Sequence, residues 1–236
     1  IEADGRLGKV MSSLVQSGKG PHARQTAPHP HAVVFDPSGK YIAAADLGID
    51  KVEILALRNG ALERVSEKAA TPGAGPRHVA FTPDGKALYA INELDATIVG
   101  WRFDPATGAL GEEIARVSTV PADFTGQKST AEILVHPSGR FLWGSNRRFG
   151  DHPAADSIVG FRVDPATGGL SRIGLTTEGI AFPRAFQLDP AGRFLYALNQ
   201  KGDTIVQHAI DPSTGALRGT GHIAAVPTPA CLVLKT

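Results

Sequence analysis

An internal repeat constrains the fold of this chain more than any other feature of the sequence. Four segments of twelve residues align without gaps, and their first residues are 46, 54 and 53 positions apart: 35–46, 81–92, 135–146 and 188–199. Each contains Pro, one further residue, Gly, and then Lys or Arg. This is the composition of a tight turn, because Pro sets φ and Gly allows a positive φ. A second turn sequence follows each segment, at 57–62, 104–110, 164–170 and 211–217.

Short apolar runs lie between these turns and predict β-strands. The run AVVF precedes the first turn and YIAAA follows it, which is typical of a hairpin. A third run, such as TIVGWRF, leads to the second turn, and a fourth run follows that turn. Four short strands in roughly 50 residues, without helical periodicity, predict an all-β propeller of four-stranded antiparallel blades. A solenoid is the alternative, but hairpin-linked strands with alternating patterning favour the propeller. Trp101 and Trp143 lie within strand patterns and are expected in the core.

The repeat predicts one propeller domain over residues 1–236. Complete blades are expected at about 31–73, 77–121, 131–177 and 184–225. Residues 1–28 begin like the end of a third strand with its turn, which predicts a partial blade. The terminal run ACLVLKT, at 230–236, stands where the first strand of a further blade belongs. In closed propellers such a strand completes a blade with N-terminal strands and so removes an exposed edge. We therefore expect a chain shortened at its N-terminal side, with missing blades or a second copy completing the ring.

Residues just before the first strand and just after the second strand of each blade share one rim of the disc. In the alignment of the four repeats, one position (one column) at this rim is Asp or Asn in every blade: Asp46, Asn92, Asn146 and Asn199. These side chains are expected to cap the following turn through hydrogen bonds to the backbone. The neighbouring columns differ in residue type between blades. A residue needed for the fold should recur in every blade, so these variable positions are expected to form a functional site. The polar residues in these columns are His31, Arg77, His78, Glu93, Glu132, Arg147, Arg184 and Gln200.

Two interpretations of this charged rim remain open. Charges crowded at a narrow channel mouth are costly unless they pair with each other or with a ligand, so the rim is predicted to be a functional site. The alternative is a set of ion pairs that hold neighbouring blades together. The segment 147–156 is an enlarged loop that either covers the rim as a lid or is an ordinary surface insertion.

Composition and motifs exclude several other functions. The net charge is +1 and acidic and basic residues are mixed, which predicts no nucleic-acid partner and no membrane surface. No apolar run approaches the roughly 20 residues that cross a bilayer. Cys231 is the only cysteine, and His29 with His31 lacks carboxylates at ligand spacing, so we expect no metal and no cofactor. No nucleophile elbow or phosphate-binding glycine loop is present.

Four runs carry a resemblance to a known family: HPHAVVFDPSGKYIAAADLGIDKV, GPRHVAFTPDGKALYAINE, AEILVHPSGRFLWGSNR and FPRAFQLDPAGRFLYALNQ. They resemble the lactonase family of seven-bladed propellers, which includes propeller-type 6-phosphogluconolactonases and the fungal 3-carboxy-cis,cis-muconate lactonizing enzyme. Seven blades of roughly 50 residues need about 350 residues, so this chain would cover about five blades. The resemblance implies a metal-free site in the central cleft and a cytoplasmic enzyme of carbohydrate metabolism. It implies catalytic roles for His31, Arg77, Glu93 and Arg147 and substrate binding by His78, Glu132, Arg184 and Gln200.

The predicted function is hydrolysis of an anionic sugar lactone such as 6-phosphogluconolactone. Either Glu93 or His31 would act as the general base that activates a water molecule, because imidazole is readily poised near neutral pH and a carboxylate also accepts protons. Arg77 and Arg147 would hold the oxyanion and the anionic group of the substrate. A muconate-type lactonizing enzyme and a non-catalytic propeller that binds a ligand or a protein are the alternatives.

Overall fold

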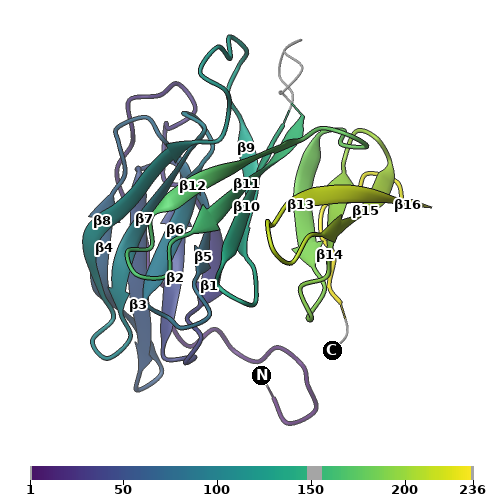
Figure 1. The fold of residues 1–236 in the computed structure, drawn as a ribbon. Helices are drawn as coiled ribbons and strands as arrows, with labels where there is room; N and C mark the ends of the chain where they lie inside the picture. Colours follow the sequence, from purple (N-terminus) through teal and green to yellow (C-terminus); the bar gives the residue numbers. More distant parts are fainter. Residues whose placement is uncertain (1, 148–155, 235–236) are drawn as a thin grey trace.

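The computed structural model describes residues 2–147 and 156–234, which contain sixteen strands and no helix (Figure 1). The strands form four antiparallel sheets, each built from four strands that follow one another in the sequence. The predicted fold class, an all-β protein of four-stranded antiparallel blades, is therefore confirmed. Within the described ranges there is no helix that could cross a membrane.

Each sheet occupies one of the four stretches in which the repeat predicts a complete blade. The first sheet contains β1 (Pro30–Phe35), β2 (Tyr41–Asp46), β3 (Lys51–Arg58) and β4 (Ala61–Ala69). The second contains β5 (Pro76–Phe81), β6 (Ala87–Asn92), β7 (Thr97–Asp104) and β8 (Ala109–Ser118). The third contains β9 (Thr130–Val135), β10 (Phe141–Asn146), β11 (Ser157–Val163) and β12 (Leu170–Thr176). The fourth contains β13 (Pro183–Leu188), β14 (Phe194–Asn199), β15 (Thr204–Ile210) and β16 (Leu217–Ala225).

The Pro-x-Gly turns connect the first two strands of each sheet, as the repeat predicts. Gly85 has a φ of 65°, in the left-handed region that residues with a Cβ rarely adopt. In the first sheet the Asp36 carboxylate accepts hydrogen bonds from the backbone N–H groups of Ser38 at 3.1 Å and Tyr41 at 2.7 Å. These bonds satisfy turn donors that the sheet ladder leaves unpaired, so short local sequences determine where each hairpin bends.

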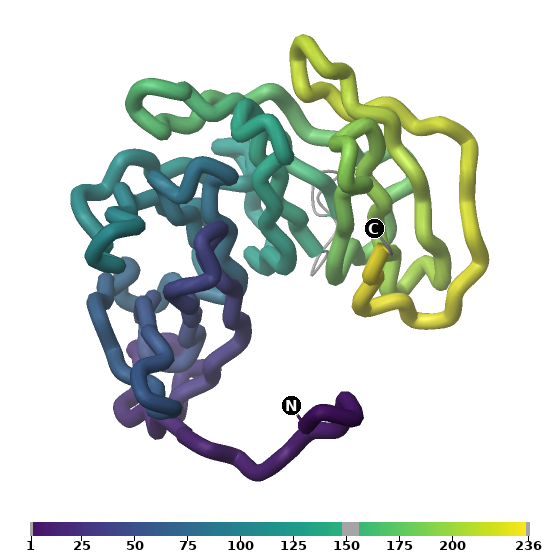
Figure 2. The backbone as a smooth tube through the Cα atoms, turned by 90° about the horizontal axis from the view of Figure 1, so that it is seen from below, coloured from purple at the N-terminus to yellow at the C-terminus, as the bar shows by residue number. Residues whose placement is uncertain are grey.

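The sheets follow one another along an open arc, from the N-terminal purple end to the C-terminal yellow end (Figure 2). The first strands β1, β5, β9 and β13 contact their neighbours in this order along the concave side of the arc. Apolar side chains fill the space between consecutive sheets. Trp101, 3% exposed, belongs to the cluster between the first and second sheets, and Trp143, 1% exposed, to the cluster between the third and fourth. The prediction that both tryptophans are core residues is confirmed.

The uniform Asp/Asn column binds loop backbone in three of the four blades, and in the first blade it also caps the turn after the second strand. The Asp46 carboxylate accepts hydrogen bonds from the N–H groups of His29 at 2.8 Å and Gly48 at 2.9 Å. The Asn146 amide donates to Thr119 O at 3.0 Å, and the Asn199 amide donates to Gly179 O at 2.7 Å. All four side chains are buried, and the expected cap of the following turn is seen at Asp46, whereas Asn146 and Asn199 bind the loop that leads into their own sheet.

The two ends of the described chain are not in sheets. Residues 2–28 form no strand, although Ser12 Oγ accepts a hydrogen bond from Leu62 N at 2.9 Å and the buried Gln25 amide donates to Asp50 at 2.7 Å. Residues 230–234 form no strand either, and 235–236 lie outside the described residues. A strand needs a ladder of backbone hydrogen bonds, and neither end pairs in this way with a described strand. The partial blade at 1–28 and the closing strand at 230–236 stay predictions.

The first sheet leaves apolar side chains uncovered within the described chain. Val33 is 69% exposed and Phe35 is 65% exposed. Their counterparts in the second sheet, Val79 and Phe81, are only 3% and 9% exposed because the first sheet covers them. Packing of this face against further blades, or against a second copy, stays a prediction.

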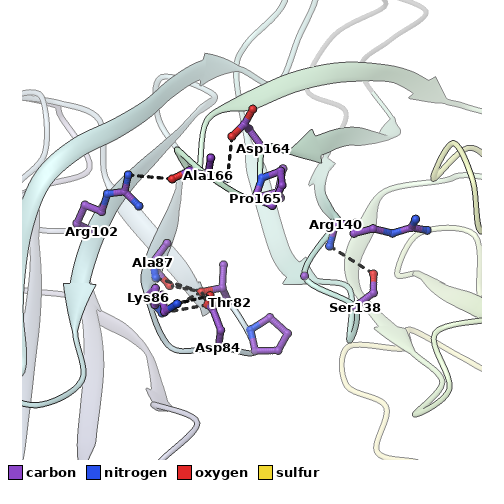
Figure 3. A pocket seen from close by; sticks show the side chains of 14 residues that line it. Thr82, Asp84, Lys86, Ala87, Arg102, Ser138, Arg140, Asp164, Pro165 and Ala166 are labelled. Carbon is purple, nitrogen blue, oxygen red and sulfur yellow. Dashed lines mark hydrogen bonds and ion pairs between the residues drawn. The ribbon is translucent and has the colours of Figure 1, made fainter.

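A cavity of about 440 Å³ lies between the second and third sheets at the end that carries the Pro-x-Gly turns, and Figure 3 shows the side chains that line it. The seventh position of the repeat is aromatic in three blades but is Ala87 in the second. Tyr41 packs so closely on the following blade that a Cβ at Gly108 would lie 2.5 Å from its ring, and Phe141 packs in the same way on Gly215. At the corresponding Gly168 no ring from position seven is present and Ile114 makes the close contact instead, while the cavity is lined by Gly168 and Ala87.

We predict that Ala87→Phe fills this cavity and raises the free energy of unfolding by about 1 kcal/mol, the usual gain when a cavity is filled without strain. Urea denaturation measures the difference. Ala90→Phe is the matched control, because Ala90 lies on the same strand, is fully buried and does not line this cavity. Overpacking should destabilise Ala90→Phe by about 1 to 3 kcal/mol. Equal destabilisation by both variants would contradict the missing-ring interpretation.

Candidate active site

The polar residues that break the repeat lie at the end of the sheets opposite the Pro-x-Gly turns. The register places Pro76 beside Asn92 and Thr130 beside Asn146, so the start of each first strand lies next to the end of the second. The pairing is irregular at this end of all four first strands. A β-bulge redirects a side chain away from the regular alternation. Three of the irregularities span the candidate site residues His31, Arg77 and Arg184.

Glu93 lies at the centre of an ion-pair cluster. Its Oε2 is 2.9 Å from Arg77 Nε and 3.1 Å from an Arg147 guanidinium nitrogen, and its Oε1 is 2.7 Å from an Arg24 guanidinium nitrogen. Glu93, Arg77 and Arg147 are all buried. Burial alone would raise the pKa of Glu93, but the charges of Arg147, Arg24 and Arg77 outweigh it and hold the pKa below its ordinary value. Glu93 therefore stays ionised at neutral pH.

Two of these arginines also bind the backbone of the third sheet. Arg77 donates a hydrogen bond to Ala131 O at 2.7 Å. Arg147 donates to Thr130 O at 2.8 Å and to Ser129 Oγ at 2.9 Å. Burial, followed by the nearby Arg147 charge, lowers the pKa of Arg77 to about 10, which still leaves its guanidinium charged at neutral pH. The cluster thus connects the second and third sheets as well as supplying positive charge.

Arg184 adds a fourth guanidinium to this cluster. Its charge contributes to lowering the pKa values of both Arg77 and Arg147, so it lies close enough to repel them. Within the described residues Arg184 forms no hydrogen bond or ion pair. Three guanidiniums therefore contact the Glu93 carboxylate, and the charge of Arg184 acts on two of them. Such an excess of like charge is unfavourable unless an anion neutralises it, and guanidinium groups bind carboxylate and phosphate in a bidentate manner.

A second polar group, made of two histidines and a glutamate, lies beside the arginines. The rings of His31 and His78 are 5.2 Å apart between centroids, and His78 Nδ1 is 2.6 Å from Glu132 Oε1. The His31 residue is exposed overall, but local packing around its ring and the Arg77 charge lower its pKa to about 4. This lowered pKa keeps the His31 ring neutral at neutral pH.

The structure brings together seven of the eight residues predicted for the site. The exception is Gln200, whose backbone N–H donates to Phe182 O at 3.1 Å and whose side chain makes no hydrogen bond within the described chain. Arg24 was not predicted, because it lies in the N-terminal segment, where no repeat column marks it.

Of the segment 147–156, residues 148–155 lie outside the described residues, so the lid hypothesis stays a prediction. Within the described chain no group of three or more His, Cys, Asp or Glu is placed to hold a metal ion.

Together, the repeated four-stranded sheets and the charged rim define a β-propeller with a polar site on one face. The family model described as "Lactonase, 7-bladed beta-propeller" matches residues 1–234. The chain belongs to this family.

Individual relatives agree with this assignment. The 6-phosphogluconolactonase of Bacillus subtilis is 37% identical over 233 residues, which are 98% of this chain and 64% of that protein. The 6-phosphogluconolactonase of Formosa agariphila is 32% identical, with 92% of this chain and 61% of that protein covered. The solved structure of the Pseudomonas aeruginosa periplasmic gluconolactonase PpgL superposes with a TM-score of 0.85 at 32% identity, and 98% of this chain and 63% of that one are covered. The chain thus spans somewhat less than two-thirds of these relatives.

We predict that Glu93→Gln lowers the free energy of unfolding by about 3 kcal/mol, because it leaves buried guanidiniums without their carboxylate. The matched control is Glu67→Gln, which removes an exposed carboxylate 2.8 Å from Lys51 and should cost less than about 1 kcal/mol. Urea denaturation at neutral pH measures both.

The same cluster predicts a pH dependence. The folded protein lowers the pKa of Glu93 from its ordinary value of 4.5, so the stability that Glu93 contributes is complete above about pH 4.5 and is lost as the pH falls through the lower folded value. The difference between wild type and Glu93→Gln should shrink over that acidic range. A difference at neutral pH no larger than that of Glu67→Gln would contradict the central role of Glu93.

Proposed function

We propose that the protein hydrolyses an anionic sugar lactone, with 6-phosphogluconolactone as the substrate to test first. The observation that carries this proposal is the excess of guanidinium charge around Glu93, with Arg184 free of any protein partner within the described residues. An anionic substrate would supply the missing negative charge. The names of the relatives, two 6-phosphogluconolactonases and a gluconolactonase, support a sugar lactone as the class of substrate.

Ester hydrolysis needs stabilisation of the negative charge that develops on the carbonyl oxygen. Arg77 and Arg147 are suited to this role because they are buried, charged and held by hydrogen bonds to the backbone of the third sheet. Such fixed groups need little reorganisation when the charge develops. Arg184 is suited to the phosphate or carboxylate of the substrate, since no protein group competes for it in the described chain.

Of the two general bases considered from the sequence, Glu93 is the less suitable. Both of its oxygens already contact guanidinium groups, and these lower its pKa, so it accepts a proton poorly. Its role in the proposal is to hold the arginines in place. The base then comes from the histidine side of the site, where His31 and His78 lie together.

We expect Arg184→Gln to raise KM for an anionic lactone about tenfold or more, because a hydrogen bond to a charged group contributes about 1.5 to 3 kcal/mol. Its kcat, and its activity on a neutral lactone of similar size, should change less than about twofold. Arg193→Gln is the control, since Arg193 is an exposed arginine of the same sheet that pairs with Asp189 at the opposite end.

Lactone-dependent acid release by the purified protein at neutral pH, followed with a pH indicator, measures these constants. Equal KM values for Arg184→Gln and wild type would exclude Arg184 as the anion-binding group. Absence of acid release by the wild type with every anionic sugar lactone would overturn the proposed activity and favour the alternative of a non-catalytic binding propeller.

A further inference from the structure

The site contains a carboxylate–imidazole pair that the arginine cluster does not include. We propose that His78 is the general base of the reaction and that Glu132 is the positioning residue that orients its ring. This proposal rests on the proposed lactone hydrolysis and assigns the group that activates the water molecule. His78 is on β5 and Glu132 on β9, so the pair joins the first strands of two neighbouring sheets.

The geometry of the pair leaves one ring nitrogen of His78 as a base. His78 Nδ1 lies 2.6 Å from Glu132 Oε1. An ionised carboxylate has no proton to donate, so Nδ1 carries the hydrogen and Nε2 carries the free lone pair. Catalytic bases in hydrolases are commonly oriented by a third group in this way.

The position of Glu132 is itself fixed. Its Oε1 also accepts a hydrogen bond from Ile133 N at 3.1 Å, and its backbone N–H donates to Ser145 Oγ at 2.9 Å. The side chains of His78 and Glu132 are 26% and 15% exposed, so the pair is sheltered but reachable. A hydrogen-bonded carboxylate of this kind holds the ring in one orientation, which is what a positioned base requires.

The pair also lines a cavity. A cavity of about 280 Å³ is formed by side chains of β1, β5 and β9, and His78 and Glu132 are its titratable groups. Its other walls are mainly apolar and include Val34, Phe35 and Ile133. Small-molecule sites are typically apolar pockets of roughly 300 Å³ or more with a few placed polar groups. Arg77 precedes His78 on β5, and the charge of Glu132 partly offsets the lowering of the Arg77 pKa by burial, so the pair lies next to the arginine cluster.

His31, the other imidazole, is the weaker candidate. Desolvation of its ring and the Arg77 charge lower its pKa to about 4, which makes it a poor proton acceptor at neutral pH. Its ring instead lies 5.2 Å from that of His78, tilted by 53°. The neutral state of His31 avoids a second positive charge beside the base.

The proposed step balances as follows. His78 Nε2 takes one proton from a water molecule as the water oxygen bonds to the carbonyl carbon of the lactone, and the carbonyl electron pair moves to the oxygen beside the guanidiniums. When the tetrahedral intermediate collapses, the ring C–O bond breaks. The protonated Nε2 then gives its proton to the leaving oxygen. The product is the open-chain hydroxy acid, which releases a proton to the solvent, and His78 returns to its neutral form.

Steady-state kinetics on 6-phosphogluconolactone test the assignment. His78→Gln should lower kcat by roughly 10²-fold or more, the usual effect of losing a positioned base, with KM changed less than about threefold. Glu132→Gln should lower kcat about tenfold with KM unchanged, and a merely structural role would not produce this separation. His222→Gln is the control, because His222 is an exposed histidine on β16, away from the first strands, and its kcat should equal that of the wild type.

Nitrogen-15 NMR of the histidine rings gives a readout that does not depend on activity. The wild type should show His78 with its proton on Nδ1, and Glu132→Gln should shift the population toward the Nε2–H tautomer. An active enzyme in which His78→Gln keeps its kcat would overturn this proposal and leave the lactonase function standing. A wild type that hydrolyses no anionic lactone overturns both, and a wild-type Nε2–H tautomer overturns the base assignment whatever the activity.

Discussion

Three guanidinium groups from separate parts of the chain meet on the single buried carboxylate of Glu93. Arg24 comes from the N-terminal segment, Arg77 from the start of the second sheet, and Arg147 from the end of the second strand of the third sheet. Burying one such charge without a partner costs several kcal/mol, so these groups are stable at this rim only as a set. The ion pairs therefore connect the sheets and concentrate positive charge at one face. Structure and proposed function depend on the same contact.

The site separates two chemical tasks between two groups of side chains. The arginines supply fixed positive charge, and the hydrogen bonds of Arg77 and Arg147 to the third sheet hold that charge in place. His78 and Glu132, one column further along the first strands, supply an oriented imidazole beside a mainly apolar cavity. Because the repeat places equivalent positions of every blade at one rim, changes at a few positions are sufficient to build both groups on an otherwise uniform scaffold.

Much of this organisation can be predicted from local sequence. The Pro-x-Gly turns and the apolar runs beside them determine where each strand begins and ends, since the stabilising contacts, such as those of Asp36 with Ser38 and Tyr41, are made within a few residues. The clustering of these polar residues was predictable because they depart from a pattern that is otherwise kept, and their function stays a prediction. The sequence alone left open whether Glu93 or His31 is the base, because which side chains contact Glu93 depends on how neighbouring sheets pack. Arg24 lies outside the repeat, so no comparison between blades marks it.

The central claim is that the arginine cluster binds the anionic group of the substrate while His78 lies at the ester carbon. A crystal structure of the protein with 6-phosphogluconate, the product of the proposed reaction, tests it most directly. The account predicts one anionic group of the ligand within hydrogen-bonding distance of the Arg184 guanidinium, and the carboxylate carbon beside His78 Nε2. Binding of the ligand at the opposite end of the sheets, for example in the cavity next to Ala87, would contradict the account.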